Sequence, residues 1–228
     1  MDRTNAPGAP EQEDGGLRAR LVTVGAELVA AEGVQALTLR EIARRAGVSH
    51  GAPRRYFPTH LSLLSAIARR GFEELSEHLA AEADAQPQSN PRAQLLGMAR
   101  AYLDFARTHP GMYELMFRHD LLESGHLGLR ETSLPMFTTL VDLVARVRSR
   151  SEAGTRPTVG TWPTTDTRPT TDTYPSAEPQ SVAGALWANL HGIAQLWSWG
   201  ALQLATGAGD VEPLLRAALD AHLGPAPR

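Results

Sequence analysis

Residues 38–60, TLREIARRAGVSHGAPRRYFPTH, decide the fold of this chain, because they predict two short helices around a tight turn. Thr38 and Glu41 have the spacing of a capping box at the start of the first helix. Apolar residues then follow at helical spacing, and Gly47 ends the helix. The pattern is typical of a helix-turn-helix motif.

The second helix of the motif is expected over residues 50–57, with Ser49 as its N-cap. Pro53 falls in its first turn, where at most one intrahelical hydrogen bond is lost. Two adjacent guanidinium groups on the outer face suit a DNA major groove, since each can bond a guanine edge or straddle phosphates. The alternative is a plain corner between helices with solvated arginines. The residues on the outer face are His50, Gly51, Arg54 and Arg55.

Positive charge is concentrated around this motif. The 228-residue chain has a formal net charge of −3, yet residues 17–70 hold nine arginines against three glutamates, a net +6 that leaves −9 elsewhere. This asymmetry favours a phosphate-binding module attached to a domain that does not bind DNA. It argues against a non-specific architectural binder, which needs a broad basic surface.

Together with its flanking helices, the motif resembles the amino-terminal domain of the TetR family of transcriptional regulators. The resemblance covers residues 17 to about 75 and rests on several motifs in combination. These are a helix ending in Gly33, Thr-x-Arg-x-Ile-Ala at 38–43, Gly-Val-Ser at 47–49, Tyr-Phe at 56–57 and a long fourth helix.

The resemblance implies a role for each matching residue. Thr38 and Tyr56 would contact phosphates, Arg40 would reach a base or a phosphate, and the outer face of the second helix would meet the bases. His60 replaces the usual Lys of the family, so its phosphate contact should be weaker and sensitive to pH. Pro53 and Arg54 also depart from the family pattern, so no base preference can be transferred. The implied DNA-binding residues are Thr38, Arg40, Ser49, His50, Gly51, Arg54, Arg55, Tyr56 and His60.

Helical periodicity extends along most of the chain without strand alternation, which predicts an all-α fold. We expect a three-helix helix-turn-helix domain at residues 17–62, joined to a larger helical effector-binding and dimerisation bundle at residues 63–228. The fourth helix, continuing to about Ala85, would connect the two. Residues 1–16 are rich in Pro, Gly and acidic side chains and predict a disordered tail.

Residues 151–179 interrupt the helical pattern. Pro-Thr-Thr-Asp-Thr occurs twice there, at 163–167 and 169–173, and aliphatic residues are nearly absent. Such a tract cannot bury a core, so it predicts a disordered loop within the second domain. A Pro-rich segment that docks a partner is the alternative.

Helices are expected again at residues 182–206 and 210–223, the second capped by Asp210. Both are apolar on more than one face, which predicts burial against a partner subunit and hence a homodimer. The run of Trp187, His191 and Gly192 resembles the carboxy-terminal domain of a TetR subgroup named for Trp, His and Gly.

A small-molecule effector site is expected inside this second domain. Large apolar and aromatic side chains at helical spacing could line a cavity there, and plain core packing is the alternative for each of them. The candidate effector-binding residues are Tyr102, Phe105, Met112, Met116, Trp187 and His191.

An enzyme is not expected. The chain has no Cys, no Gly-x-Ser-x-Gly, no Gly-x-Gly-x-x-Gly and no P-loop motif, and no cofactor is implied. His119, Glu123 and His126 have the spacing of a zinc site on a helix, but Gly125 and Gly128 argue against a continuous helix, so no metal is expected. Neither a signal peptide nor an 18-residue apolar run appears, which predicts a cytoplasmic protein without membrane contact.

The sequence therefore predicts a transcriptional regulator that acts as a repressor, binds a near-palindromic operator as a homodimer and is released by a small-molecule effector. The alternative is a DNA-binding dimer without an effector that acts as a constitutive or architectural regulator.

Overall fold

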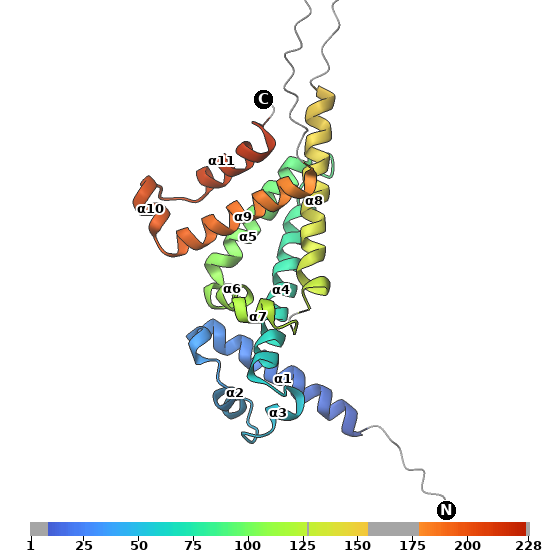
Figure 1. Ribbon diagram of the computed structural model, residues 1–228, viewed down its shortest axis with the longest axis vertical. Helices are drawn as coiled ribbons and strands as arrows, with labels where there is room; N and C mark the ends of the chain where they lie inside the picture. Colours follow the sequence, from blue (N-terminus) through green and yellow to red (C-terminus); the bar gives the residue numbers. More distant parts are fainter. Residues whose placement is uncertain (1–8, 127, 155–177, 227–228) are drawn as a thin grey trace, which may run out of the picture. The chain divides into compact units, whose positions relative to one another are not determined.

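The computed structural model describes residues 9–126, 128–154 and 178–226, and these residues form helices and no strands (Figure 1). The prediction of an all-α fold is confirmed. None of the helices described is long and apolar enough to cross a membrane. The helices are α1 (Ala9–Glu32), the 3-10 turn η1 (Val34–Ala36), α2 (Leu39–Arg45), α3 (Pro53–Tyr56), α4 (His60–Asp84), α5 (Pro91–Thr108), α6 (Pro110–Met116), α7 (His119–Glu123), α8 (Leu129–Gly154), α9 (Pro179–Ser198), α10 (Ala201–Thr206) and α11 (Glu212–Leu223).

The chain forms two compact units. The first comprises Met1–Glu77 and Asp104–Pro135, and the second comprises His78–Leu103 and Met136–Arg228. The boundaries between the units fall within α4, α5 and α8. The first unit is larger than the predicted domain at 17–62, because it also contains α6 and α7.

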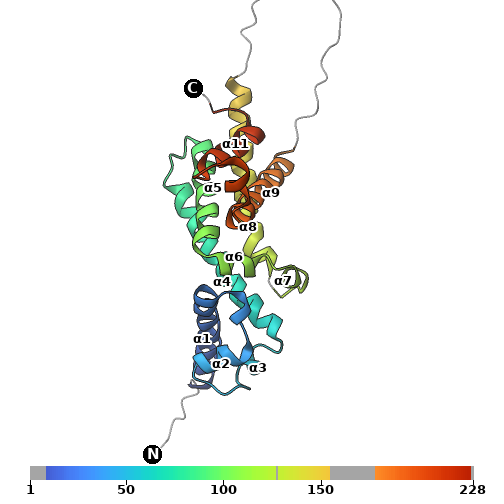
Figure 2. The same cartoon turned by 90° about the vertical axis from the view of Figure 1, so that its left-hand side faces the viewer.

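The core of the first unit forms where α1 packs against α2, α3 and η1 (Figure 2). Leu21 and Leu28 form the apolar stripe of α1 and are fully buried, as is Ile67 of α4. Gly25 allows α1 to approach α4 closely, since a Cβ atom at Gly25 would lie 2.3 Å from Cδ1 of Ile67. The helix-turn-helix is therefore held on a tightly packed scaffold.

Helix α6 packs against both α1 and η1 within the same unit. Pro110 occupies its first turn, where a missing N–H is tolerated. Gly111 then lies directly on the end of α1, since a Cβ atom there would be 2.6 Å from the carbonyl oxygen of Val29. This approach is possible only for glycine.

In the second unit α9 packs against α11 and α10. The buried side chains include Leu186 and Leu190 of α9 and Leu219 of α11. An ion pair joins α5 to the start of α11, with Nε of Arg100 2.9 Å from Oε2 of Glu212. The hydrogen bond from Arg100 holds the pKa of Glu212 below its usual value.

Several predicted helix boundaries differ from the structure, and two of the differences are large. Helix α1 begins at Ala9, before the predicted start at Leu17, so the tail predicted at 1–16 is helical from Ala9 onward. The helix predicted at 182–206 is broken by Gly200, whose φ of 73° is left-handed and favours glycine. Residues 1–8 and most of the Pro/Thr-rich loop lie outside the described residues.

Candidate nucleic-acid interface

Thr38 begins the helix-turn-helix as predicted. It is the N-cap of α2, and its Oγ1 accepts a hydrogen bond from the backbone N–H of Glu41 at 3.2 Å. The side chain of Thr38 is exposed, and its hydroxyl hydrogen can still be donated to a phosphate oxygen. The cap therefore fixes the first turn of α2 at a position open to solvent.

Not all positive charge on α2 is available for DNA. Glu41 pairs with Arg44 at 2.5 Å and with Arg45 at 2.7 Å. Hydrogen bonds from Arg44 and then Arg45 lower the pKa of Glu41 to about 2, so its carboxylate stays charged at neutral pH. Arg45 also pairs with Glu32 at the end of α1.

Arg40 differs from these two arginines. It is exposed and makes no ion pair or hydrogen bond to the described residues. Among the arginines of α2 it is therefore the one whose guanidinium is not engaged by a carboxylate. Arg40 is also the arginine of α2 that the family resemblance singles out for DNA contact.

The helix predicted at 50–57 is shorter in the structure. Regular α3 covers Pro53–Tyr56, with Ala52 as its N-cap and no side-chain capping bond, so the predicted cap at Ser49 is wrong. The carbonyl of Ser49 instead accepts the N–H of Ala52 at 3.0 Å. Because Pro53 has no N–H, it cannot donate the bond that would extend the α-helix toward His50.

The faces of this segment agree with the sequence prediction. Pro53 and Phe57 are buried, and the ring of Pro53 lies in the core beneath the turn. Tyr56 is half-buried. The exposed residues are Ser49, His50, Gly51, Arg54 and Arg55, all of which are predicted DNA contacts.

His60 has a structural contact that the sequence did not predict. Its Nε2 lies 2.6 Å from the carbonyl oxygen of Leu37, which accepts the ring hydrogen. This bond joins the start of α4 to the residue before Thr38. A phosphate contact by His60 remains a prediction and would have to use the other ring nitrogen or a changed ring position.

Two further arginines of the basic segment hold the helix-turn-helix together. The guanidinium of Arg18 lies over the ring of Phe57, 5.2 Å from its centroid, and Arg20 donates to the carbonyl oxygen of Ala46. In the charge count of the sequence, Arg18 and Arg20 appear only as two positive charges. No local pattern marks them, because their partners lie 39 and 26 residues away along the chain.

The six candidate effector residues fall into two groups. Phe105, Met112 and Met116 are buried in the first unit. A Cβ atom at Gly71 would lie 2.7 Å from the sulfur of both methionines, so they pack closely on α4. These three side chains have the surroundings of core residues.

Tyr102, Trp187 and His191 are brought together in the second unit. The hydroxyl of Tyr102 lies 2.9 Å from Nδ1 of His191, and the rings of Trp187 and His191 are 6.5 Å apart. Phe137 lies 6.3 Å from Trp187 and was missed by the sequence analysis, since α8 gave no aromatic pattern. Burial lowers the pKa of His191, which favours the neutral ring.

The zinc-site pattern does not form a single helical face. Helix α7 ends at Glu123, and both Gly125 and Gly128 have left-handed φ values of 70° and 67°. Nε2 of His119 lies 3.4 Å from Oε1 of Glu123. The backbone carbonyl of His126 instead accepts a hydrogen bond from Arg69.

Two family profiles match the chain. The profile described as "Bacterial regulatory proteins, tetR family" matches residues 21–67. The profile described as "Tetracyclin repressor-like, C-terminal domain" matches residues 95–222. Together they cover the helix-turn-helix and most of the second unit.

A curated relative is the nucleoid occlusion factor SlmA of Haemophilus ducreyi, 28% identical over 100 residues, which are 43% of this chain and 48% of the relative. The chain thus spans about half the length of the curated relatives it matches.

Solved structures match over nearly the whole chain. A protein of unknown function from Rhodococcus sp. RHA1 has a TM-score of 0.62 and 24% identity, with 97% of each chain covered. The multidrug binding protein EbrR, solved with imidazole, has a TM-score of 0.58 and 21% identity, with 98% of this chain and 99% of EbrR covered. At these identities the likeness establishes the fold. Because the carboxy-terminal profile alone spans more than half of the residues, the chain belongs to the TetR family of bacterial DNA-binding regulators.

Proposed function

We propose that this chain is a cytoplasmic, ligand-responsive repressor that binds a near-palindromic operator as a homodimer and is released by a small-molecule effector. The observation that carries the DNA-binding part is the exposure of Arg40, Arg54 and Arg55 on the two helices of the helix-turn-helix. Arginine at such positions can make bidentate contacts with guanine or with phosphate.

Dimerisation is supported by the outer face of α9. Gly184, Ala188 and Gly192 are spaced four residues apart, and a Cβ atom at either glycine would meet nothing within 4 Å. Trp187, beside this face, is 43% exposed, which is unusual for so large an aromatic side chain. A second α9 could approach this face closely, and a two-fold dimer matches a near-palindromic operator.

Effector binding is supported by the cluster of Tyr102, Trp187 and His191. The Tyr102–His191 hydrogen bond places a polar pair beside aromatic rings, which is the usual composition of small-molecule sites. EbrR, which shares the fold, is described as a multidrug binding protein. We also assign the chain to the Trp-His-Gly subgroup on the run from Trp187 to Gly192.

A second candidate function is that of a DNA-binding regulator that responds to no effector. It is favoured by the match to SlmA, a nucleoid occlusion factor, although this match covers only 48% of the relative. Such a protein would bind its DNA sites constitutively. Its carboxy-terminal bundle would serve dimerisation alone.

Selection of bound duplexes from a random pool tests the first step. A ligand-responsive repressor should enrich a sequence with two half-sites about one helical turn apart, and Arg54→Ala should lose preference for it. Enrichment of no sequence would refute the operator part of the proposal.

The selected operator then allows a screen for effectors. Compounds that shift the melting temperature of the protein are titrated into the protein–operator complex. An inducer must lower the affinity of the protein for the operator by the same factor by which the operator lowers the affinity of the protein for the inducer, because linkage is reciprocal. Compounds that bind near His191 and leave operator affinity unchanged would favour the constitutive regulator.

A further inference from the structure

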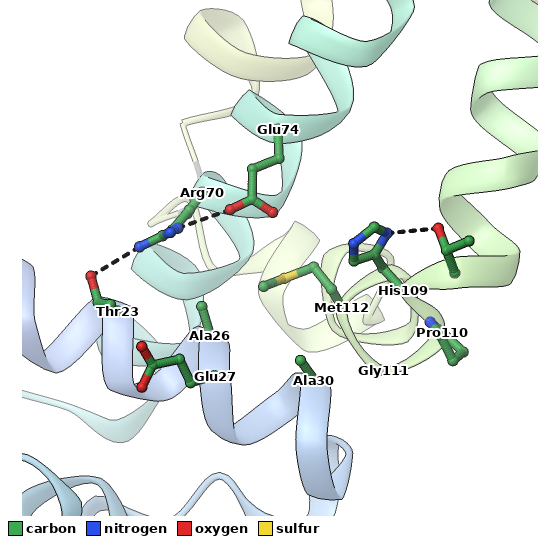
Figure 3. Close-up of a pocket in the computed structure, with 11 residues that line it drawn as sticks. Thr23, Ala26, Glu27, Ala30, Arg70, Glu74, His109, Pro110, Gly111 and Met112 are labelled. Carbon is green, nitrogen blue, oxygen red and sulfur yellow. Dashed lines mark hydrogen bonds and ion pairs between the residues drawn. The ribbon is translucent and has the colours of Figure 1, made fainter.

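A groove in the first unit lies apart from the helix-turn-helix face and from the Tyr102–His191 cluster. Its cavity volume is about 240 Å³, and it is bounded by α1, α4, α6 and the end of α5 (Figure 3). Typical drug-sized ligands occupy about 300–1,000 Å³, so this groove suits a smaller molecule.

One face of α1 forms a wall of the groove. Thr23, Ala26, Glu27 and Ala30 follow the i, i+3, i+4, i+7 spacing that places residues on one helix face. The two alanines leave space beside the helix. Across the groove, Met112 of α6 points into the gap in Figure 3.

Among the described residues, the charged side chains of the groove leave one carboxylate without a partner. Arg70 donates to Thr23 and to Glu74, each at 2.9 Å, so its charge is matched by Glu74. Glu27 is exposed and makes no ion pair or hydrogen bond to other residues that the structure describes. The charges of Arg70, Glu27 and Glu74 in the lining sum to −1, which attracts a cation.

The remaining lining suits the apolar body of an organic cation. Ala26, Ala30, Pro110 and Met112 offer hydrocarbon and thioether surface, and the Met112 side chain can adapt to different shapes. The ring of His109 is held in place, since it stacks on Phe105 at 4.8 Å and its Nδ1 lies 2.9 Å from Oγ1 of Thr108.

We propose that this groove is a second ligand site, which binds a small organic monocation such as an amidinium or a primary amine. The cationic group pairs with Glu27, and the apolar body lies against Ala30 and Met112. A bound cation touches α1 and α6 at once, so it stabilises the packing of α6 on the first helix of the DNA-binding unit. The site is independent of the effector proposed for the second unit.

Calorimetric titration of the full chain with benzamidinium tests this site, with neutral benzamide as the matched probe. Benzamidinium should bind more tightly than benzamide. In NMR spectra, the backbone amide chemical shifts of the protein that change on adding benzamidinium should centre on residues 108–112. Glu27→Gln should weaken benzamidinium about fivefold, as loss of a partly exposed ion pair does, and should leave benzamide unchanged. Glu73→Gln, at an exposed position of α4 outside the groove, is the control.

Steric filling provides a second test. Ala30→Leu should abolish benzamidinium binding, whereas Ala31→Leu, at the neighbouring exposed position outside the groove, should not. Equal binding of the two probes, or no effect of Glu27→Gln, would overturn the proposal. Since Glu27 is exposed and has no ion pair within the described part of the chain, Glu27→Gln should fold even if Ala30→Leu does not.

Discussion

Replacing Gly111 by alanine tests the contact between α6 and α1. The new Cβ atom would lie 2.6 Å from the carbonyl oxygen of Val29 and 3.4 Å from the Cα of Gly33. Both are backbone atoms, and the Val29 oxygen already accepts the N–H of Gly33 at 3.0 Å. The methyl group can therefore be accommodated only if α6 moves away from α1.

The cost of this change can be bounded. Overpacking of a close contact costs about 1–3 kcal/mol. Alanine is favoured over glycine in a helix interior by about 1 kcal/mol, and only part of this applies in the first turn of α6, where Gly111 lies. We expect Gly111→Ala to lower the free energy of unfolding by about 1–2 kcal/mol, which lowers the melting temperature by about 2–8 °C in a chain of this size.

Gly71→Ala is the matched control. Its Cβ atom would lie 2.7 Å from the sulfur atoms of Met112 and Met116, which are parts of flexible side chains. Because the methionines can shift, the free energy of unfolding should change by less than about 1 kcal/mol.

Urea denaturation followed by far-ultraviolet circular dichroism, at one fixed protein concentration, measures both variants. If Gly111→Ala is as stable as the wild type, the close approach of α6 to α1 does not constrain the fold, and the reasoning is wrong. Stability close to that of the wild type is expected for Gly71→Ala and is compatible with a tight contact between α6 and α1.

Three further predictions concern DNA binding, assembly and pH. Arg54→Ala and Arg55→Ala should each weaken specific operator binding, measured by fluorescence anisotropy, by about 1–3 kcal/mol without changing the fold. Wild-type affinity in both variants would show that the recognition helix is misassigned. If the protein dimerises through the outer face of α9 as proposed, Ala188→Arg should be a monomer on gel filtration, whereas Ala80→Arg, at an exposed position of α4, should remain a dimer. A dimeric Ala188→Arg would exclude the outer face of α9 as the interface. Since the pKa of Glu41 is lowered from 4.5 to about 2, its ion pairs should contribute fully above pH 4.5 and be lost as the pH falls toward 2. Titration of the Glu41 carboxyl by NMR with a midpoint near 4.5 would show that these pairs do not form in solution.

Features set by neighbouring residues could be predicted from the sequence. Thr38 caps α2 through Glu41 as the spacing indicated, and α4 ends at Asp84, close to the predicted Ala85. The predicted start of α3 is wrong, because the missing N–H of Pro53 outweighs the capping preference of Ser49. At Gly200 the apolar periodicity continues across a left-handed residue, so the periodicity alone could not reveal the break.

Contacts between distant residues were beyond prediction. Trp187 and His191 are four residues apart in the sequence, so their proximity on a helix is predictable, but the hydrogen bond between Tyr102 and His191 joins residues 89 positions apart. The separation of Phe105 from Tyr102 into different compact units likewise depends on where each helix packs. Periodicity identifies the buried face of a helix and not the neighbour that covers it.

The net +6 of residues 17–70 overstates the charge that is free to meet phosphates. Several arginines of this segment bond to or stack on other described residues of the protein, among them Arg18, Arg20, Arg44, Arg45, Arg69 and Arg70. Since these guanidinium groups already have partners within the protomer, we expect one protomer alone to bind DNA weakly. In the proposed dimer the DNA-binding residues would occur twice, and the second protomer would then bind at a high effective concentration. Operator affinity should therefore depend steeply on dimerisation, which connects the outer face of α9 to the function of the helix-turn-helix.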